Sequence, residues 1–247
     1  MMRIGDTGQG PGRTWSGAGL AAAFVVVALL PMTYLHVIGA AVVDPFVTTI
    51  SDYVGVPGGF ALLAVAAGSL ALAALVLAGG LAPAGLPRPD GPARMLASGA
   101  AALVVVALFP TNYPGTPVGI VANVHRVAGA WVFLSLPLAC WLIARRAREA
   151  SNWRPTAPAL SWCAGITGVV SAVFLLSHLP MVLSDSLVVP LQGGLERVLY
   201  ALVMLSLLAT ARALRFAVVG ARSTAPVRNR LQTPAGDFGT GDLGRAA

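Results

Sequence analysis

The chain has 247 residues, of which 57% are hydrophobic and only 10% are charged, and its mean hydropathy is +0.80. A soluble domain is usually about 45–50% apolar and about 25% charged, so this chain has too few charges to cover a water-exposed surface. The composition therefore excludes a cytosolic enzyme, a disordered chain and a nucleic-acid-binding domain. It predicts an integral membrane protein.

Charged residues divide the hydrophobic sequence into six segments that are long enough to cross a membrane. A spanning helix needs about 20 mostly apolar residues. The predicted helices, in chain order, cover residues 18–41, 60–80, 94–110, 125–144, 159–181 and 194–216. We therefore expect an all-α fold, a transmembrane six-helix bundle within residues 18–217.

The two ends of the chain lie outside this membrane domain. Residues 1–17 form a short segment before the first helix, and residues 218–247 are polar, contain Gly and Pro, and lack hydrophobic periodicity. Such a composition is typical of a disordered tail. A signal peptide is the alternative for the N-terminus, but the apolar run from Gly17 to Val43 exceeds the usual apolar core of about 7–15 residues. We expect an uncleaved helix.

The positive charges lie almost entirely on one side of the predicted bundle. All sixteen basic residues are arginines, and fourteen of them precede the first helix, lie in the second and fourth connections, or lie in the last turns of the final helix and after it. Arg126 and Arg197 are the two exceptions. Because arginines are enriched in cytoplasmic loops, both termini are predicted to be cytoplasmic.

The opposite, outer side of the bundle collects the less common polar residues. Ionisable residues at membrane depth are costly and usually face the bundle interior or a water-filled cavity. We therefore predict an outward-facing polar pocket, with candidate residues Ser51, Asp52, Asn112, His125, Arg126, His178, Asp185, Glu196 and Arg197.

Four elements in this order resemble a bacterial six-helix membrane family catalogued as domain of unknown function 998. They are the run Asp44–Tyr53 with its Ile-Ser-Asp, Phe109-Pro-Thr111, His125, and Gly194-Leu-Glu-Arg197. The Ile-Ser-Asp element is also similar to a loop of the damage-regulated autophagy modulator group. The resemblance covers roughly residues 18–216. It implies the six-helix fold and its topology in a bacterial plasma membrane, and no particular reaction.

Each carboxylate of the predicted pocket has a structural alternative. Ser51 and Asp52 could form a local turn or cap instead of facing a ligand, because their side-chain oxygens accept from nearby backbone N–H groups. Glu196 and Arg197 are neighbours on one helix and should have different partners. If Glu196 points inward, Arg126 is its expected counter-ion, and if Arg197 does, Asp52 is.

The histidines suggest a metal site as a further possibility. His125 and His178, with Asp52 as a third ligand or as a base, could hold zinc and activate a water molecule. The chain lacks a paired motif such as HxxxH, and a histidine at a helix end often binds a carbonyl or a headgroup instead. His125 and His178 could also be axial ligands of a haem. His36, which follows Pro31 by just over one helical turn, is the weakest of the three candidates.

Two functions follow from these residues. The first is a multi-pass membrane protein whose outward pocket recognises a lipid headgroup or another outer-leaflet ligand, with membrane lipids as its partners. The alternative is a metal-dependent hydrolase that cleaves a lipid ester or amide, with Asp52 as the candidate catalytic residue. Transport is disfavoured because the midplane positions of all six segments are Ala, Val, Leu and Gly.

Overall fold

The computed structural model describes residues 15–113, 116–117, 119–178 and 191–223. The helices in this part of the chain are α1 (Trp15–Ile38), η1 (Ile50–Gly55), α2 (Gly59–Leu81), α3 (Asp90–Leu108), α4 (Ile120–Ala147), η2 (Arg154–Thr156), α5 (Ala157–Ser177) and α7 (Gln192–Ser223), of which η1 and η2 are 3₁₀ helices. Within the described ranges, six helices are long and apolar enough to cross a membrane, and there is no strand. The predicted all-α membrane bundle of six helices is confirmed.

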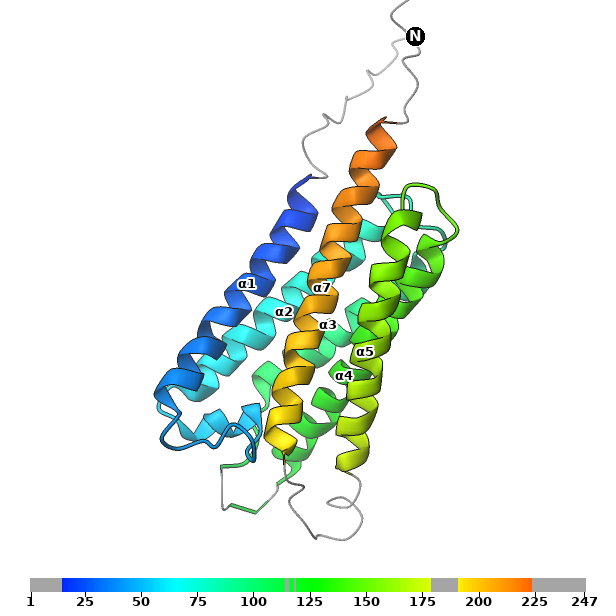
Figure 1. Ribbon diagram of the computed structural model, residues 1–247. Helices are drawn as coiled ribbons and strands as arrows, with labels where there is room; N and C mark the ends of the chain where they lie inside the picture. The colour runs from blue at the N-terminus through cyan, green and yellow to red at the C-terminus, as the bar shows by residue number, and fades with distance from the viewer. Residues whose placement is uncertain (1–14, 114–115, 118, 179–190, 224–247) are drawn as a thin grey trace, which may run out of the picture.

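The six long helices run side by side and form a closed ring (Figure 1). Each helix packs against the next along the chain, and α7 closes the ring because it packs against both α5 and α1. It also contacts α2 and α4. The last helix is therefore the element that joins the two halves of the bundle.

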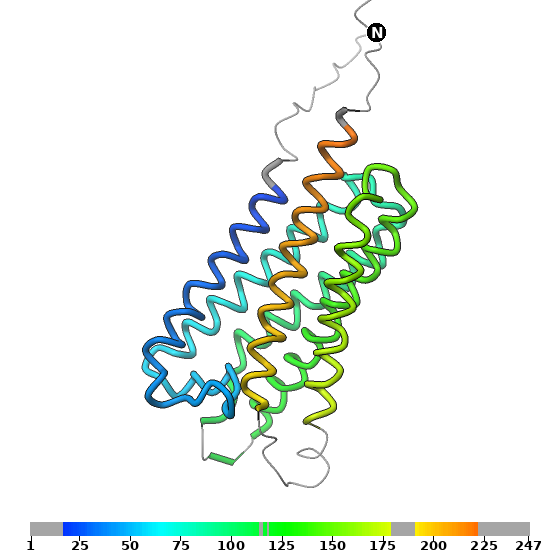
Figure 2. Tube along the Cα trace, in the orientation of Figure 1, coloured from blue at the N-terminus to red at the C-terminus, as the bar shows by residue number. Residues whose placement is uncertain are grey.

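The described ends of the chain, Trp15 and Ser223, lie at the same end of the bundle, as the trace shows (Figure 2). The α2–α3 and α4–α5 connections lie at that end too, which we call the terminal end. The short helix η1 lies at the opposite end, which we call the η1 end. The described parts of the α1–α2 and α3–α4 connections, which the sequence assigned to the outer side, lie at the η1 end.

The helices differ from their predicted bounds mainly where polar residues continue a helix. Helix α7 extends to Ser223, beyond the predicted end at 216 and the domain border at 217, because Arg212 and Arg215 are tolerated in a helix whose cations reach the membrane surface. The predicted tail thus begins with helical residues, and 224–247 lie outside the described residues, as does the segment 1–14.

Alanines and leucines together form the interior of the bundle, and many large apolar residues cover its exterior. On α2 the buried positions include Ala66, Ala67 and Leu70, whereas Val127 and Trp162 are 71% and 73% exposed on α4 and α5. Small residues let helix backbones approach closely within a membrane, where lipid solvates the large apolar side chains. The apolar exterior distinguishes this bundle from a soluble protein and explains the high hydropathy.

A cluster at the terminal end fixes the connections on the side away from η1. Trp153 is fully buried, and its indole N–H donates to Ala84 O at 2.9 Å. Asn152 Nδ2 donates to Ala84 O at 3.2 Å and to Ala217 O at 3.4 Å. Arg88 pairs with Glu149 at 2.6 Å, and this hydrogen bond holds the pKa of the Glu149 carboxyl below its ordinary value. The α2–α3 and α4–α5 connections are thereby joined to α7.

Candidate functional site

The turn of η1 is closed by its own polar side chains. Asp52 Oδ2 accepts from the backbone N–H of Thr49 at 2.7 Å and from Thr49 Oγ1 at 2.9 Å. Ser51 Oγ lies 2.8 Å from the same Thr49 hydroxyl. Since Thr49 Oγ1 donates its one proton to Asp52, Ser51 is the donor to Thr49. The contacts of Asp52 are those of the local turn, which was one of its two predicted roles.

The first turn of α7 attaches η1 to the bundle. Glu196 Oε2 accepts from the backbone N–H of Ile50 at 2.6 Å, and the N–H of Gly194 donates to Phe46 O at 3.2 Å. Gly193 lies against the Thr48 carbonyl so closely that a Cβ at this position would be 2.0 Å from Thr48 O. The sequence needs glycine here because the two backbones meet without room for a side chain. We call these contacts, with those of Arg197, the η1 clamp.

Arg197 completes the η1 clamp with four neutral acceptors. Its Nε donates to His36 Nε2 at 2.9 Å, and its Nη1 donates to Thr48 O at 2.8 Å and to Gly193 O at 3.0 Å. Its Nη2 lies 3.4 Å from the Tyr53 hydroxyl, and its guanidinium lies over the Tyr53 ring. One side chain thus joins α1, the segment before η1, η1 itself and α7.

His36 has a defined tautomer in this network. Its Nδ1 lies 2.7 Å from Met32 O, and a carbonyl can only accept, so Nδ1 carries the proton. The neutral ring then presents Nε2 as the acceptor for Arg197. His36 was the weakest of the three histidine candidates in the sequence. In the structure it accepts a hydrogen bond from the charged side chain of Arg197, a predicted pocket residue on another helix.

Glu196 and Arg197 do have different partners, as their adjacent positions predicted. The expected counter-ions were wrong, however. Glu196 binds a backbone N–H rather than Arg126, whose Nη2 instead lies 3.4 Å from Asn112 Oδ1. Asp52 binds Thr49 rather than Arg197. Glu196 and Arg197 bind backbone groups of the connection between α1 and η1 instead of the predicted charged side chains. These backbone groups are available because they have no helical hydrogen bonds of their own.

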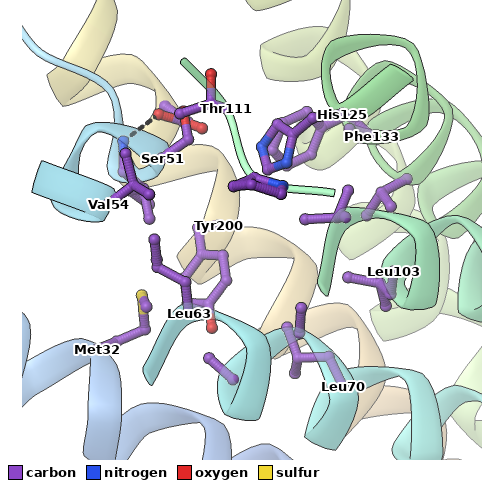
Figure 3. A pocket seen from close by; sticks show the side chains of 18 of the residues that line it. Met32, Ser51, Val54, Leu63, Leu70, Leu103, Thr111, His125, Phe133 and Tyr200 are labelled. Atoms are coloured by element: carbon purple, nitrogen blue, oxygen red, sulfur yellow. Dashed lines mark hydrogen bonds between the residues drawn. The ribbon is translucent and has the colours of Figure 1, made fainter. Parts of the chain in front are cut away.

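A cavity of about 820 Å³, with its open mouth included, lies beside the η1 clamp. We call it the η1 cavity. Figure 3 shows its lining, which comes from α1, η1, α2, α3, α4 and α7 and from the segment after α3. Most of the walls are apolar, among them Met32, Val54, Phe60, Leu63, Ala66, Ala67, Leu70, Leu103, Val106, Val132, Phe133 and Val203. The prediction of a polar pocket is corrected in this respect.

Three polar residues of the η1 cavity, Ser51, His125 and Glu196, have a hydrogen-bond acceptor available for a ligand. Ser51 gives its proton to Thr49, so its oxygen is left to accept. His125 Nδ1 lies 2.7 Å from Phe109 O and must be the protonated nitrogen of the neutral ring, which leaves Nε2 as an acceptor. Glu196 Oε2 accepts from the Ile50 N–H, and in its ionised form the Glu196 carboxyl group has no proton to donate. These three residues come from η1, α4 and α7, elements that are distant in the sequence and meet at the cavity.

The structure divides the predicted pocket residues into two groups. Ser51, His125 and Glu196 line the η1 cavity, whereas the other described candidates do not. Asn112 and Arg126 contact each other at the bundle surface, and His178 Nδ1 binds Phe174 O at 2.8 Å while its Nε2 contacts the Gln192 side chain. Asp185 lies outside the described residues. The charged and polar residues of the η1 end thus do not form one pocket, because they take part in several separate contacts.

Sequence reasoning did not select Tyr200 and Thr111, which also line the η1 cavity. Tyr200 follows Glu196 by four positions, and residues with this spacing lie on one face of a helix. The spacing could have identified Tyr200 once Glu196 was chosen. Thr111 lies in the segment after α3, where no periodic pattern indicates the direction of a side chain.

The predicted zinc ligands do not come together in the described part of the chain. There, no group of three His, Cys, Asp or Glu side chains is arranged to hold a metal ion. Asp52 is engaged by Thr49, and one ring nitrogen of both His125 and His178 is engaged by a carbonyl. The metal-dependent hydrolase and the haem alternative therefore rest on the sequence alone.

Comparison with known proteins gives one family. No curated protein and no solved structure matches the chain. The model of the family described as protein of unknown function (DUF998) matches residues 20–213, from α1 to α7. This range covers most of the chain and all six long helices, with the η1 clamp and the η1 cavity between its limits. The chain belongs to the DUF998 family, as its Ile-Ser-Asp, Phe-Pro-Thr and Gly-Leu-Glu-Arg elements predicted.

Proposed function

We propose that this multi-pass membrane protein binds an uncharged lipid alcohol in the η1 cavity, with the hydroxyl group at Ser51, His125 and Glu196 and the apolar part against α2, α3 and α4. The observation that carries the proposal is that Ser51, His125 and Glu196 offer acceptors in one lining whose other walls are mostly apolar. An amphipathic molecule matches both parts, because its chain replaces lipid and its polar end finds partners.

The direction of the hydrogen bonds selects a donor as the polar group of the ligand. Ser51 Oγ, His125 Nε2 and the Glu196 carboxylate can all accept, and a hydroxyl can donate to any of them. A phosphodiester headgroup has acceptors only, and it would find no donor at Ser51, at the neutral His125 or at an ionised Glu196. The proposal therefore narrows the expected lipid headgroup to a hydroxyl-bearing one.

The charge of the lining favours an uncharged ligand. No arginine is among the described residues that line the η1 cavity, since Arg126 and Arg197 are engaged elsewhere. An anionic ligand would lack a counter-ion and would meet Glu196. A positively charged ligand would lose its hydration at membrane depth, at a cost of about 3 kcal/mol. A neutral hydroxyl avoids this cost.

We further propose that the η1 cavity faces the outer leaflet of a bacterial plasma membrane, with both termini cytoplasmic. Support comes from the arginines, fourteen of sixteen of which fall at the terminal end or in the flanking segments beside it. A reporter that is active only outside the cytoplasm, fused after Arg222, is expected to be inactive, and the same reporter inserted after Thr116 is expected to be active. The reverse pattern would place the η1 cavity on the cytoplasmic side.

The binding proposal is tested with a photoactivatable dodecanol and the full chain in lipid nanodiscs. Gly129 of α4 lines the η1 cavity, and a Cβ there meets nothing within 4 Å, so Gly129→Leu is expected to fill space without a clash. We expect this variant to reduce labelling at least about tenfold, because the added side chain occupies the volume of several methylene groups, each worth about 0.8 kcal/mol of burial. Peptide mapping should place the wild-type label on the cavity lining.

Gly168→Leu is the matched control, because Gly168 is also a mid-helix glycine whose Cβ would meet nothing within 4 Å, and it does not line the η1 cavity. Its labelling is expected to equal that of the wild type. Unlabelled dodecanol should compete with the probe, whereas dodecyl phosphate should not. Equal labelling of both glycine variants, or equal competition by the alcohol and the phosphate, would contradict the proposal.

A further inference from the structure

The hydroxyl of Tyr200 lies buried within the membrane part of the bundle, and it has no hydrogen-bond partner among the described residues. Tyr200 lines the η1 cavity from α7. In Figure 3 its hydroxyl points away from Ser51 and Thr111, toward the side of the cavity where Leu63 and Leu70 lie. The polar atom therefore lies among the apolar walls beside the cavity, away from the acceptors at the η1 end.

A buried hydroxyl without a partner is unfavourable. Its desolvation costs on the order of 1–3 kcal/mol in proteins, and within a membrane no solvent replaces the lost hydrogen bond. Phenylalanine would fill the same space without this cost. A tyrosine at this position is thus explained if its hydroxyl pairs with something that enters the cavity.

We propose that the ligand of the η1 cavity is a lipid alcohol with a second oxygen group inside its apolar part, and that Tyr200 binds this second oxygen. The inference rests on the proposed function, which accounts for the first hydroxyl and for the apolar walls. Tyr200 then determines which lipid alcohols bind well, because a plain hydrocarbon chain would leave the phenol unpaired while a carbonyl or hydroxyl at the right depth would accept its proton.

The depth of the second oxygen can be measured with a series of keto-alcohols. Dodecanol and its isomeric keto derivatives, with the carbonyl moved stepwise along the chain, are titrated against the full chain in nanodiscs by competition with the photoactivatable dodecanol. We expect the affinity to peak at one or two adjacent carbonyl positions, about five- to tenfold above the neighbouring isomers, since one hydrogen bond accounts for a factor of this size. In Tyr200→Phe the peak should disappear and plain dodecanol should still bind.

Tyr34→Phe is the control. Tyr34 is a tyrosine of α1 that is 55% exposed, and it belongs neither to the η1 clamp nor to the lining of the η1 cavity. This variant is expected to keep the affinity peak. Without ligand, Tyr200→Phe is expected to have a melting temperature equal to or above that of the wild type, because it removes an unpaired group.

The outcomes separate the two proposals. A flat keto series in the wild type, with dodecanol still bound, would overturn the second oxygen and leave the lipid-alcohol site intact. A peak that survives in Tyr200→Phe, or a clear fall in the melting temperature of the ligand-free variant, would show that the phenol has another partner and would overturn the inference. Failure of dodecanol itself to bind would overturn the proposed function.

Discussion

Replacement of Gly193 by alanine is expected to destabilise the protein by about 2–4 kcal/mol, measured as a fall in the melting temperature of the detergent-solubilised full chain. The new Cβ would lie 2.0 Å from Thr48 O and 3.0 Å from Arg197 Nη1, so the segment before η1 must move away from α7. Overpacking of this kind costs about 1–3 kcal/mol, and a weakened hydrogen bond from Arg197 to Thr48 adds about 1.5–3. The higher helix propensity of alanine returns only about 1 kcal/mol.

The neighbouring glycine provides the control. At Gly194 a Cβ would lie 3.6 Å from Phe46 Cδ1, which is an ordinary contact. Gly194→Ala is therefore expected to leave the melting temperature unchanged or to raise it slightly, through helix propensity. The same substitution at these two adjacent glycines should thus change the melting temperature in opposite directions, or at least by different amounts. If both variants melted like the wild type, the close approach of the η1 segment to α7 would be wrong.

Arg197→Leu is expected to lower stability by at least about 3 kcal/mol, because hydrogen bonds to a charged group contribute about 1.5–3 kcal/mol each. The substitution removes the donors to His36, Thr48 and Gly193 at 2.8–3.0 Å and leaves their acceptors without this partner. Arg197→Lys should recover part of the loss, since a lysine keeps the charge but lacks the planar fork that reaches several acceptors at once. Thermal unfolding and limited proteolysis of the η1 segment measure both effects.

Arg126→Leu is the matched control for the loss of one arginine at the same end of the bundle. Arg126 is exposed, and its one described contact is a 3.4 Å approach to Asn112. We expect its removal to change stability by less than about 0.5 kcal/mol, as is usual for surface substitutions. Equal destabilisation by Arg126→Leu and Arg197→Leu would show that charge at this end, rather than the η1 clamp, stabilises the protein.

The η1 clamp also determines the shape of the η1 cavity. Ile50, Ser51 and Val54 of η1 form one of its walls, and the clamp holds η1 against α7 through Glu196 and Arg197. Gly193→Ala and Arg197→Leu should therefore weaken labelling by the dodecanol probe in the variants that remain folded, although neither residue is part of the cavity lining. The Gly-Leu-Glu-Arg element thus positions one wall of the η1 cavity.

The sequence alone determined the class of the protein and the number of its helices. Six long apolar segments separated by arginines leave few alternatives, because backbone groups within a membrane must be paired inside each segment and helices achieve this locally. The bounds of α2 at Gly59–Leu81 differ from the predicted 60–80 by one residue at each end. The family was predicted from short elements such as Ile-Ser-Asp and Gly-Leu-Glu-Arg, because their order along the chain was sufficient to indicate it.

The partners of the polar residues were decided only by the tertiary structure. The prediction paired charges with charges, Glu196 with Arg126 and Arg197 with Asp52. The structure instead pairs each with nearby backbone groups or neutral side chains. The connection between α1 and η1 is irregular, so some of its carbonyl and N–H groups lack backbone partners and bind nearby polar side chains instead. Their positions depend on how the chain turns after Ile38, for which hydrophobic periodicity carries no signal.

The η1 cavity likewise required the three-dimensional arrangement. Its lining comes from five long helices and from η1, so no single segment of sequence contains the pattern. Polar residue type predicted Ser51, His125 and Glu196, yet it equally selected Asn112 and Arg126, which lie at the surface. Whether a residue at a helix end faces the bundle or the membrane surface depends on the rotation of that helix, and this rotation is set by packing against its neighbours. Hydropathy determines which segments cross the membrane, whereas helix packing determines what they enclose.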